Sequence, residues 1–310
     1  MSNNWYYKPT TICMLIMLLL LTTACGSDVN TGNNNGVENG NDSTTLRVAV
    51  MPTIDCLPIF LAYDHGMFKE AGLDISLRPY TAQMDCDTAI EHGRVDATVT
   101  DLVRAERMQK QGTKLDYIAA TPLYWQLITN QTARIRLLSQ LDDRMMAMTR
   151  FSATHLLSDF VVDSAKLDPD RVFRIQVNDI GVRLDMLITG IMDALFLPEP
   201  QASVARQAGH QTVYDTRQSD ICLGVLAFTQ AKPDDTLRLN QKERFIKAYN
   251  QACDSLNATP LRNYRELLVS HMGIPPLVAD SLPDSLIYFP HATAPRPKDI
   301  ERAREWLKRQ

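Results

Sequence analysis

Hydrophobic positions from residue 46 onward alternate between two spacings, one typical of buried strands and the other typical of amphipathic helices. Short apolar runs predict strands, and apolar residues three and four positions apart predict the helices between them. The strands are expected at Leu46–Met51, Leu73–Leu77, Asp96–Thr100, Tyr117–Ala120, Met145–Thr149, Phe173–Val177 and Ala194–Leu197. The helices between them are expected from Asp55 and Pro58 onward and at Asp85–His92, Leu102–Gln111, Ser152–Ala165, Ile180–Thr189 and Pro200–Ala208. This alternation predicts an α/β protein with mostly parallel sheets and right-handed crossovers.

One helix-to-strand junction occurs twice along the chain. Gly93 and Gly190 each end a predicted helix, and an Asp-Ala pair follows three residues later at Asp96 and at Asp193. Glycine suits this position because it adopts the left-handed conformation without a Cβ clash. The two junctions are 190 − 93 = 97 residues apart, which is far longer than a solenoid repeat. The repetition therefore favours two lobes of like topology, with a chance similarity as the alternative.

The amino terminus has the pattern of an export signal. Lys8 precedes the apolar run Ile12–Leu21, which has 10 residues, whereas a membrane-spanning helix needs about 20. The run fits the apolar region of a secretory signal peptide. Residues 21–25 (LTTAC) are similar to a bacterial lipobox. We therefore predict a signal peptide at residues 1–24 and lipidation of Cys25, with an ordinary signal peptide cut nearby as the alternative.

Residues 25–45 are rich in Asn, Gly, Asp and Ser and contain few apolar residues. Such a segment buries too little surface to offset the entropy lost on ordering, so we predict a flexible tether. Removing residues 1–24 takes away Lys8 and no acidic residue, which leaves a charge of 31 − 36 = −5. This mild acidity argues against nucleic acid and anionic lipid surfaces as partners. Membrane contact is thus expected through the lipid alone.

Several motifs, in order, are similar to those of type 2 periplasmic binding proteins. They include residues 58–62 (PIFLA), residues 66–75 (GMFKEAGLDI), the two Gly-x-x-Asp-Ala junctions, residues 167–170 (LDPD) and Glu199-Pro200. The chain most resembles the group that binds alkanesulfonates, nitrate and thiamine pyrimidine precursors. The similarity runs from about residue 46 to about residue 220.

The resemblance implies two Rossmann-like lobes with a central cleft, joined by two crossover segments. Lobe 1 would comprise residues 46–123 and 222–310, and lobe 2 residues 124–221. It further implies a monomeric, lipid-anchored solute-binding protein in the cell envelope, which delivers a small molecule to an ABC permease and its ATPase. No enzymatic activity, cofactor or bound metal is expected. A ligand sensor, or an enzyme for pyrimidine-precursor or small-acid chemistry on the same fold, remains the alternative.

Candidate ligand-binding residues follow from a general rule, because ligands of open α/β sheets bind beyond the carboxyl ends of the strands. The loops leaving the predicted strands and the first crossover supply Asp55, Cys56, Met84, Asp85, Cys86, Asp101, Trp125, Ser152, Thr154, Asn178 and Glu199. The acidic members outnumber Arg150, so we predict a cationic or amino-bearing ligand, with Glu199 as the best-placed carboxylate and Trp125 as an aromatic contact. In the alternative interpretation, Asp55 and Asp85 are helix N-caps and Asp101 is solvated.

Two Asp-Cys pairs, at Asp55-Cys56 and Asp85-Cys86, are expected on adjacent loops. Export makes a disulfide between the two thiols chemically possible. Sulfur and carboxylate ligands together also suit a transition metal. The third interpretation is that both cysteines are buried and act as small apolar residues, and the sequence leaves the three open.

Overall fold

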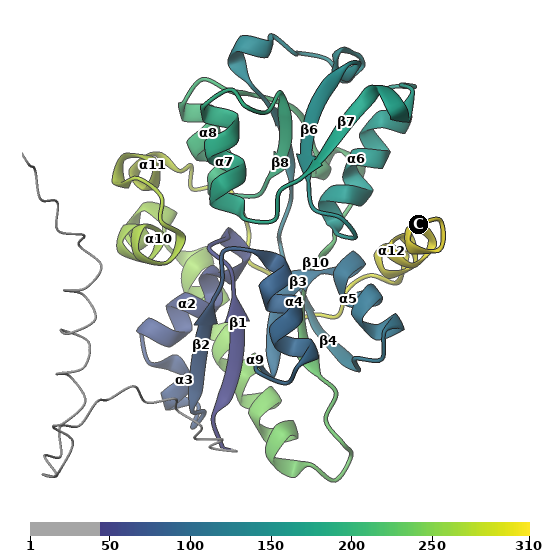
Figure 1. Cartoon of the computed structure of the whole chain (residues 1–310). Coiled ribbons are helices and arrows are strands. Elements are labelled where there is room, and N and C mark those ends of the chain that lie inside the picture. The colour runs from purple at the N-terminus through teal and green to yellow at the C-terminus, as the bar shows by residue number, and fades with distance from the viewer. Residues whose placement is uncertain (1–43) are drawn as a thin grey trace, which may run out of the picture. The chain divides into compact units, whose positions relative to one another are not determined.

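The structure is a computed structural model that describes residues 44–310. The predicted signal peptide, the lipidation of Cys25 and nearly all of the predicted tether lie outside these residues. Two five-stranded sheets form the centre of the described part (Figure 1). The first sheet has the order β2 (Ile75–Pro79), β1 (Leu46–Val50), β3 (Ala97–Asp101), β10 (Gly224–Thr229) and β4 (Leu115–Ala120). The second has the order β7 (Val172–Gln176), β6 (Arg144–Met148), β8 (Ala194–Leu197), β5 (Gln126–Thr129) and β9 (Gln211–Asp215).

The two sheets have the same topology, which confirms the expected α/β fold with two lobes. In the first sheet β1 is parallel to β2 and β3, and β10 is antiparallel to both of its neighbours. In the second, β6 is parallel to β7 and β8, and β5 is antiparallel to both of its neighbours. In each lobe, then, one strand contributed after a crossover runs against the others.

The repeated Gly-x-x-Asp-Ala junction occupies the same place in both lobes, just before the third parallel strand. Gly93 and Gly190 have φ values of 64° and 78°, as expected for left-handed helix ends. Asp96 accepts a hydrogen bond from the Arg47 N–H of β1 at 2.9 Å, and Asp193 accepts one from the Met145 N–H of β6, also at 2.9 Å. Each aspartate therefore ties the start of its strand to the first strand of the sheet.

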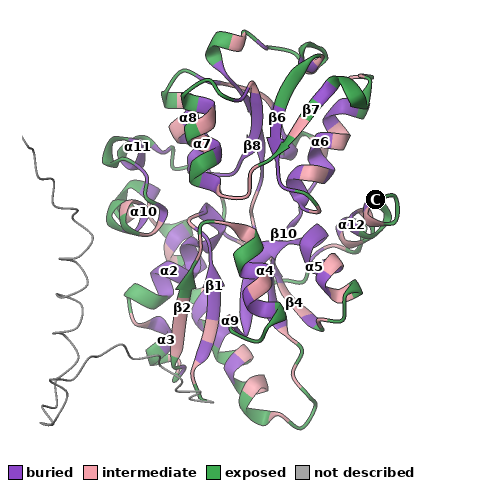
Figure 2. Ribbon diagram, viewed as in Figure 1, coloured by how far each residue is buried: buried purple, intermediate pink, exposed green. Residues whose placement is uncertain are grey.

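Helices cover both faces of the sheets, and their outward surfaces are exposed, whereas the central strands are buried and the edge strands β2 and β7 are partly exposed (Figure 2). The helices of lobe 1 in the first half of the chain are α2 (Leu57–Asp64), α3 (Met67–Glu70), α4 (Gln83–Glu91) and α5 (Leu102–Lys110). Lobe 2 contributes α6 (Ala153–Ser164), α7 (Ile180–Ile188) and α8 (Gln201–Gln207). The last part of the chain forms α9 (Thr236–Ala258), α10 (Arg265–Met272), α11 (Pro276–Ser281) and α12 (Pro297–Lys308). Short 3₁₀ turns lie at η1 (Ile54–Cys56), η2 (Gln131–Ala133), η3 (Leu138–Leu141), η4 (Pro169–Arg171), η5 (Thr216–Ser219) and η6 (Leu261–Tyr264).

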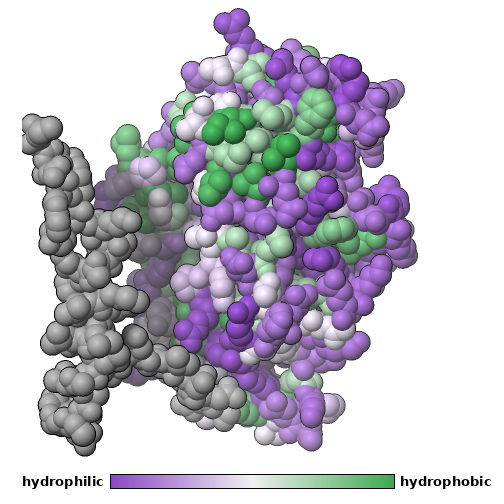
Figure 3. Space-filling view, in the orientation of Figure 1, coloured by the Kyte–Doolittle hydropathy of each residue, from purple (hydrophilic) through white to green (hydrophobic). Residues whose placement is uncertain are grey.

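The surface in Figure 3 is mostly hydrophilic, and hydrophobic side chains gather on it over α7, where Val182 and Ile188 are exposed. Within residues 44–310, no helix combines the length and the hydrophobicity that crossing a bilayer requires.

Three helices start at the cleft between the lobes because polar residues cap them there. The side chains of Asp101, Ser152 and Asp179 accept hydrogen bonds from backbone N–H groups in the first turns of α5, α6 and α7. Such capping satisfies donors that a helix leaves without an intrahelical partner. It also directs the amino ends of helices from both lobes toward the same space.

Two crossover segments, residues 121–125 and 216–223, connect the lobes and run side by side. The Thr121 N–H donates to the Gly224 carbonyl at 3.0 Å, and the Thr216 N–H donates to the Trp125 carbonyl at 3.1 Å. The Trp125 N–H in turn donates to the Thr216 hydroxyl at 3.1 Å. These bonds hold the two crossovers together as a two-stranded connection between the lobes.

Gly224 lies where the crossovers approach each other most tightly. A Cβ there would overlap the Thr121 hydroxyl and lie 2.8 Å from the Leu123 Cβ. We expect Gly224→Ala to lower the free energy of unfolding by about 1–3 kcal/mol, because the added methyl group overpacks this connection. Urea denaturation followed by circular dichroism measures this change. The matched control is Gly181→Ala in α7, where the Cβ meets only Asp179 Oδ1 at 3.3 Å; an equal loss in both variants would contradict the prediction.

The sequence pattern missed β5, β9 and β10. β5 and β10 directly follow the two crossovers, and β9 follows α8 through Gly209, whose φ is 89°. Several predicted boundaries also shift. The strand expected at Leu73–Leu77 is Ile75–Pro79, and the strand expected from Tyr117 starts at Leu115. The helix expected at Asp85–His92 starts at Gln83, with Ala82 as its N-cap.

Candidate functional site

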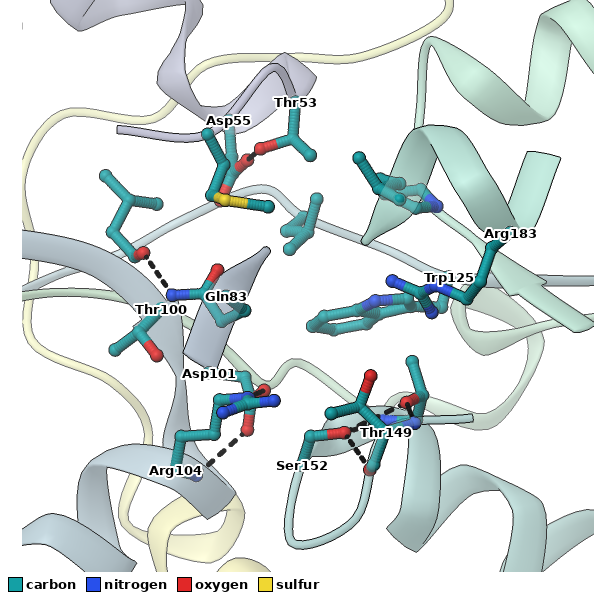
Figure 4. A pocket seen from close by; sticks show the side chains of 16 residues that line it. Thr53, Asp55, Gln83, Thr100, Asp101, Arg104, Trp125, Thr149, Ser152 and Arg183 are labelled. Carbon is teal, nitrogen blue, oxygen red and sulfur yellow. Dashed lines mark hydrogen bonds and ion pairs between the residues drawn. The ribbon is translucent and has the colours of Figure 1, made fainter. Parts of the chain in front are cut away.

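A cavity of about 50 Å³ lies between the lobes, at the carboxyl ends of the strands. Lobe 1 and the crossover line it with Met51, Thr53, Asp55, Gln83, Val99, Thr100, Asp101, Arg104, Leu123 and Trp125. Lobe 2 lines it with Thr149, Ser152, Thr154, Ile180, Arg183 and Pro198. Figure 4 shows the polar side chains of both lobes pointing toward one space.

Backbone contacts between the lobes enclose the cavity. The Ile54 N–H donates to the Glu199 carbonyl at 2.9 Å, and the Ile180 N–H donates to the Thr81 carbonyl at 3.2 Å. The Gln201 side chain donates to the Pro52 carbonyl at 2.6 Å. The lobes are therefore in direct contact on either side of the site, which is the arrangement of a closed cleft.

Asp55 forms the lobe 1 end of the cavity. It lies in η1, immediately after β1, and its side chain is buried. The Thr53 and Thr121 hydroxyls donate to its two carboxylate oxygens at 2.6 and 3.0 Å. Burial raises the pKa of the Asp55 carboxyl, and these two hydrogen bonds lower it in part. Within residues 44–310, no arginine, lysine or histidine forms an ion pair with it.

Asp101, Arg104 and Asp87 form a buried charge cluster beside the cavity. The Arg104 guanidinium contacts the Asp87 carboxylate directly and lies 3.5 Å from Asp101 Oδ2. Asp101 also caps α5 by accepting from the Arg104 N–H at 3.1 Å. Burial raises the pKa of Asp101 to about 6, against the opposing effects of Arg104 and of the Ala153 N–H in lobe 2. Asp101 is thus a point where lobe 1 meets the amino end of α6.

The raised pKa of Asp101 predicts a pH dependence of stability. Between its unfolded pKa of 3.8 and its folded value of about 6, the folded protein binds more protons at this group than the unfolded chain does. The stability that Asp101 contributes through this pKa shift is therefore fully present below the pKa of the unfolded state. It is lost as pH rises through the pKa of the folded state. A shift of about two units corresponds to roughly 3 kcal/mol. Asp101→Asn keeps a good N-cap and should remove this part of the pH dependence.

Urea titrations of wild type and Asp101→Asn at a series of pH values across this window test the prediction. The free energy of unfolding of the wild type should fall relative to that of Asp101→Asn as pH rises. A constant difference would contradict it.

The lobe 2 wall contains a set of hydroxyls at the start of α6. The Ser152 hydroxyl accepts from the Thr154 N–H at 3.1 Å and donates to the Thr149 carbonyl at 2.7 Å. The Thr154 hydroxyl accepts from the Thr149 N–H at 2.9 Å. These bonds hold the loop after β6 in place, and Trp125 from the first crossover places its ring in the cavity (Figure 4).

Arg183 extends into the cavity from the first turn of α7 (Figure 4). Its Nη1 donates to the Phe196 carbonyl at 3.1 Å, and its buried Nε has no hydrogen-bond partner. Burial lowers the pKa of Arg183 to about 10, and the like charge of Arg104 adds to this effect. A guanidinium with an unused buried donor is suited to bind an anionic group of a ligand.

Five of the predicted site residues line the cavity: Asp55, Asp101, Trp125, Ser152 and Thr154. The other six do not line it: Cys56, Met84, Asp85, Cys86, Asn178 and Glu199. Met84 and Asp85 lie exposed in the first turn of α4, and Asn178 accepts a hydrogen bond from the Gln176 side chain at 3.1 Å.

Glu199 is fully buried within its own lobe. Its Oε1 lies 2.8 Å from Arg206 Nη2 and accepts from Gln126 Nε2 at 2.8 Å. Its Oε2 accepts from the Ser203 hydroxyl at 2.7 Å and from the Ser203 N–H at 3.0 Å. The carboxylate expected to be best placed for a cationic ligand is thus already bound by neighbouring side chains.

Cys56 and Cys86 are free, buried thiols, so the disulfide alternative is not formed in this structure. The Cys56 sulfur accepts a hydrogen bond from the Met51 N–H at 3.4 Å, and burial raises the pKa of this thiol well above its ordinary value. Among the described residues, no group of three or more His, Cys, Asp or Glu side chains is arranged to hold a metal ion. Both cysteines pack in the hydrophobic core.

Sequence reasoning missed the two arginines of the cavity, Arg104 and Arg183. Both lie within the first turn of a helix, one turn beyond the loops that the strand rule selects. Their position in the sequence could have indicated a functional role. A cation near the amino end of a helix interacts unfavourably with the helix dipole, so an arginine there is expected to have another favourable interaction. Gln83, from the start of α4, was missed in the same way; it donates to the Val99 carbonyl at 3.0 Å.

Solved structures with a similar fold bind small molecules. The ligand-binding component of an ABC-type import system from Staphylococcus aureus, with zinc bound, has a TM-score of 0.72 at 14% identity, with 86% of this chain and 91% of that chain covered. The alkanesulfonate-binding protein SsuA from Xanthomonas axonopodis pv. citri, bound to MOPS, has a TM-score of 0.71 at 15% identity, with 86% and 91% covered. The periplasmic nitrate-binding protein NrtA from Synechocystis PCC 6803 has a TM-score of 0.65 at 12% identity, with 76% and 68% covered. At these identities the likeness establishes the periplasmic binding protein fold.

No curated protein matches the chain. The model of one protein family, described as "NMT1/THI5 like", matches residues 53–262. This match covers every strand of the two sheets except β1, both crossovers and all of the cavity residues except Met51. The chain therefore belongs to the NMT1/THI5-like family.

Proposed function

We propose that this protein is the extracytoplasmic substrate-binding component of an ABC-type importer and that its small-molecule ligand occupies the interlobe cavity. The observation that carries the proposal is that both lobes line one cavity at the carboxyl ends of their strands. Ligands of open α/β sheets bind at this position. Proteins of similar fold include a ligand-binding component of an ABC-type import system, an alkanesulfonate-binding protein and a nitrate-binding protein.

Binding is coupled to closure of the lobes around the crossovers. A ligand that touches Asp55 in lobe 1 and Ser152 or Arg183 in lobe 2 makes its full set of contacts only when the cleft is closed. It therefore shifts the population toward the closed state by its differential affinity. A permease can then distinguish loaded from empty protein by the distance between the lobes.

We propose that the ligand carries an amino or other cationic group. Asp55 supports this part, because it is a buried carboxylate on the cavity wall and its oxygens accept only hydrogen bonds from hydroxyls and backbone N–H groups. Trp125 supplies an aromatic surface on which a flat or cationic group is stabilised. The Glu199 carboxylate has no part in this proposal, since its partners are Arg206, Gln126 and Ser203.

We further propose that lipidated Cys25 holds the monomeric protein at a membrane, with residues 26–45 as the tether. Export and anchoring would place the cleft beside a membrane-embedded permease, as substrate delivery requires. Support comes from the residue pattern of the amino terminus.

A binding role suits the cavity better than a catalytic one. The hydroxyls of Ser152, Thr154 and Thr149 are engaged in hydrogen bonds that shape the start of α6. Hydroxyls used in this way position a ligand, whereas a nucleophile needs an adjacent base to activate it.

The test uses the processed, full-length protein and the low-molecular-weight filtrate released when the purified protein is unfolded. Small-angle scattering is recorded on the refolded, emptied protein before and after the filtrate is returned. We expect the radius of gyration to fall on addition and a co-bound species to be recovered chemically unchanged. Trp125→Ala should weaken the compaction. An unchanged radius of gyration with bound filtrate, or conversion of the recovered species, would overturn the proposal.

A further inference from the structure

Buried charges in the described part of the chain, residues 44–310, are paired, with two exceptions. Ten carboxylate or guanidinium side chains among residues 44–310 are buried, and eight of them form ion pairs. The paired ones are Asp87, Asp96, Asp101, Arg104, Glu106, Glu199, Asp215 and Asp299. Asp55 and Arg183 are the two without an ionic partner in the described part of the chain, at 1% and 7% exposure. Both line the same cavity.

The two exceptions have opposite charges and come from opposite lobes. Asp55 belongs to η1 of lobe 1, Arg183 belongs to α7 of lobe 2, and Figure 4 shows them on different sides of the cavity. A buried charge without a partner destabilises a folded protein strongly. The other eight buried charges are paired within the protein. The two that are not both line the cavity, so a ligand that enters the cavity can supply their partners.

We propose that the ligand is a small zwitterion, an amino or amidino carboxylic acid, whose cationic end pairs with Asp55 and whose carboxylate pairs with Arg183. This inference rests on the proposed function, because it requires a ligand in the interlobe cavity. The guanidinium is suited to a carboxylate since its planar N–H groups match the two oxygens in a bidentate pair. The free Nε of Arg183 supplies one of these donors.

A zwitterion explains how the ligand would be selected and how it would close the cleft. A molecule with one charge leaves either Asp55 or Arg183 buried without a partner, and that penalty lowers its affinity. A molecule with both charges neutralises both lobes at once and links them. Burial raises the pKa of Asp55 and lowers the pKa of Arg183, and the opposing effect of Asp179 on Arg183 is the smaller one.

The first test needs no ligand. We expect Asp55→Asn and Arg183→Gln to leave the melting temperature of the emptied protein unchanged or to raise it, because each removes an unpaired buried charge. The matched controls are Glu199→Gln and Arg104→Gln, which break buried ion pairs and should lower it by several degrees. If Asp55→Asn and Arg183→Gln lower the melting temperature as much as their controls do, both charges stabilise the fold and the proposal is wrong.

The second test measures dissociation constants by calorimetry for zwitterions beside analogues with one charge. One set is γ-aminobutyrate, butylamine and butyrate, and another is para-(aminomethyl)benzoate, benzylamine and benzoate, extended to other amino and amidino acids. The tightest binder should be a zwitterion, at least about tenfold tighter than either analogue. In Asp55→Asn, the zwitterion should bind no more tightly than the analogue that carries only the carboxylate. In Arg183→Gln, it should bind no more tightly than the analogue that carries only the amine.

A tightest binder with a single charge, or one unaffected by both substitutions, would overturn the proposal. The scattering measurement separates this failure from failure of the proposed function. A singly charged binder that compacts the protein overturns only the zwitterion, whereas a binder that occupies the cavity without compaction overturns the closure mechanism itself.

Discussion

Replacing Glu199 with alanine is expected to lower the free energy of unfolding by about 3 kcal/mol, one of the two largest effects that we anticipate for a single substitution. The carboxylate is fully buried and accepts hydrogen bonds from Arg206, Gln126 and Ser203. Removing it leaves a guanidinium, an amide and a hydroxyl without their acceptor and creates a small void. Urea denaturation monitored by tryptophan fluorescence measures the loss.

Two further variants show which part of the effect is ionic. Glu199→Gln keeps the shape and should lose less than Glu199→Ala, because it can still accept from Ser203. Adding Arg206→Met to Glu199→Gln should lower the free energy of unfolding only slightly further, since the ion pair is already absent. Full stability of Glu199→Ala, combined with weaker ligand binding, would instead place Glu199 in the ligand site and contradict the structure.

Replacing Arg104 with methionine is expected to cost about 3–5 kcal/mol of folding free energy. The guanidinium is 2% exposed and is the only cation paired with the buried Asp87 among the described residues. Its removal leaves the carboxylates of Asp87 and Asp101 close together without the charge that separates them. Breaking a buried pair by deleting one partner has a cost of this order. Chemical denaturation near neutral pH, where both carboxyls are ionised when unfolded, measures it.

The double variant Asp87→Leu with Arg104→Met is the control for this prediction. Apolar replacement of both members of a buried pair is often close to neutral, so we expect it to recover most of the stability that Arg104→Met loses. The two single variants and the double variant form a thermodynamic cycle that isolates the pair. A double variant no more stable than Arg104→Met would show that the guanidinium stabilises the fold by packing rather than by charge.

Much of the fold was predictable from local patterns. The periodicity of apolar residues located seven strands, with one of them displaced by two residues, and the helices between them. The Gly93 and Gly190 junctions indicated two equivalent lobes because glycine at a helix end has a local cause, its freedom to adopt positive φ. β5 and β10 could not be found in this way, because they reach their sheets through the crossovers and run antiparallel to their neighbours. β9 was missed although it follows α8 directly.

The candidate site was predictable in part. The rule that ligands bind beyond strand ends selected Asp55, Asp101, Ser152 and Thr154, which the structure brings around one cavity together with Trp125. The same rule cannot tell which way a side chain at a strand end points. Glu199 follows β8 as expected, yet its carboxylate turns toward Arg206 in its own lobe.

The residue order by itself therefore determined the α/β alternation, the duplicated lobe and the loops from which the cavity is built, since these depend on interactions between near neighbours in the chain. Only the tertiary structure decided which charges are paired. Asp55 and Arg183 are 183 − 55 = 128 residues apart, and nothing local distinguishes them from Glu199 or Arg104. Whether a buried charge finds a counter-ion depends on side chains that the crossovers bring together from distant segments, and that arrangement leaves one carboxylate and one guanidinium facing the same cavity.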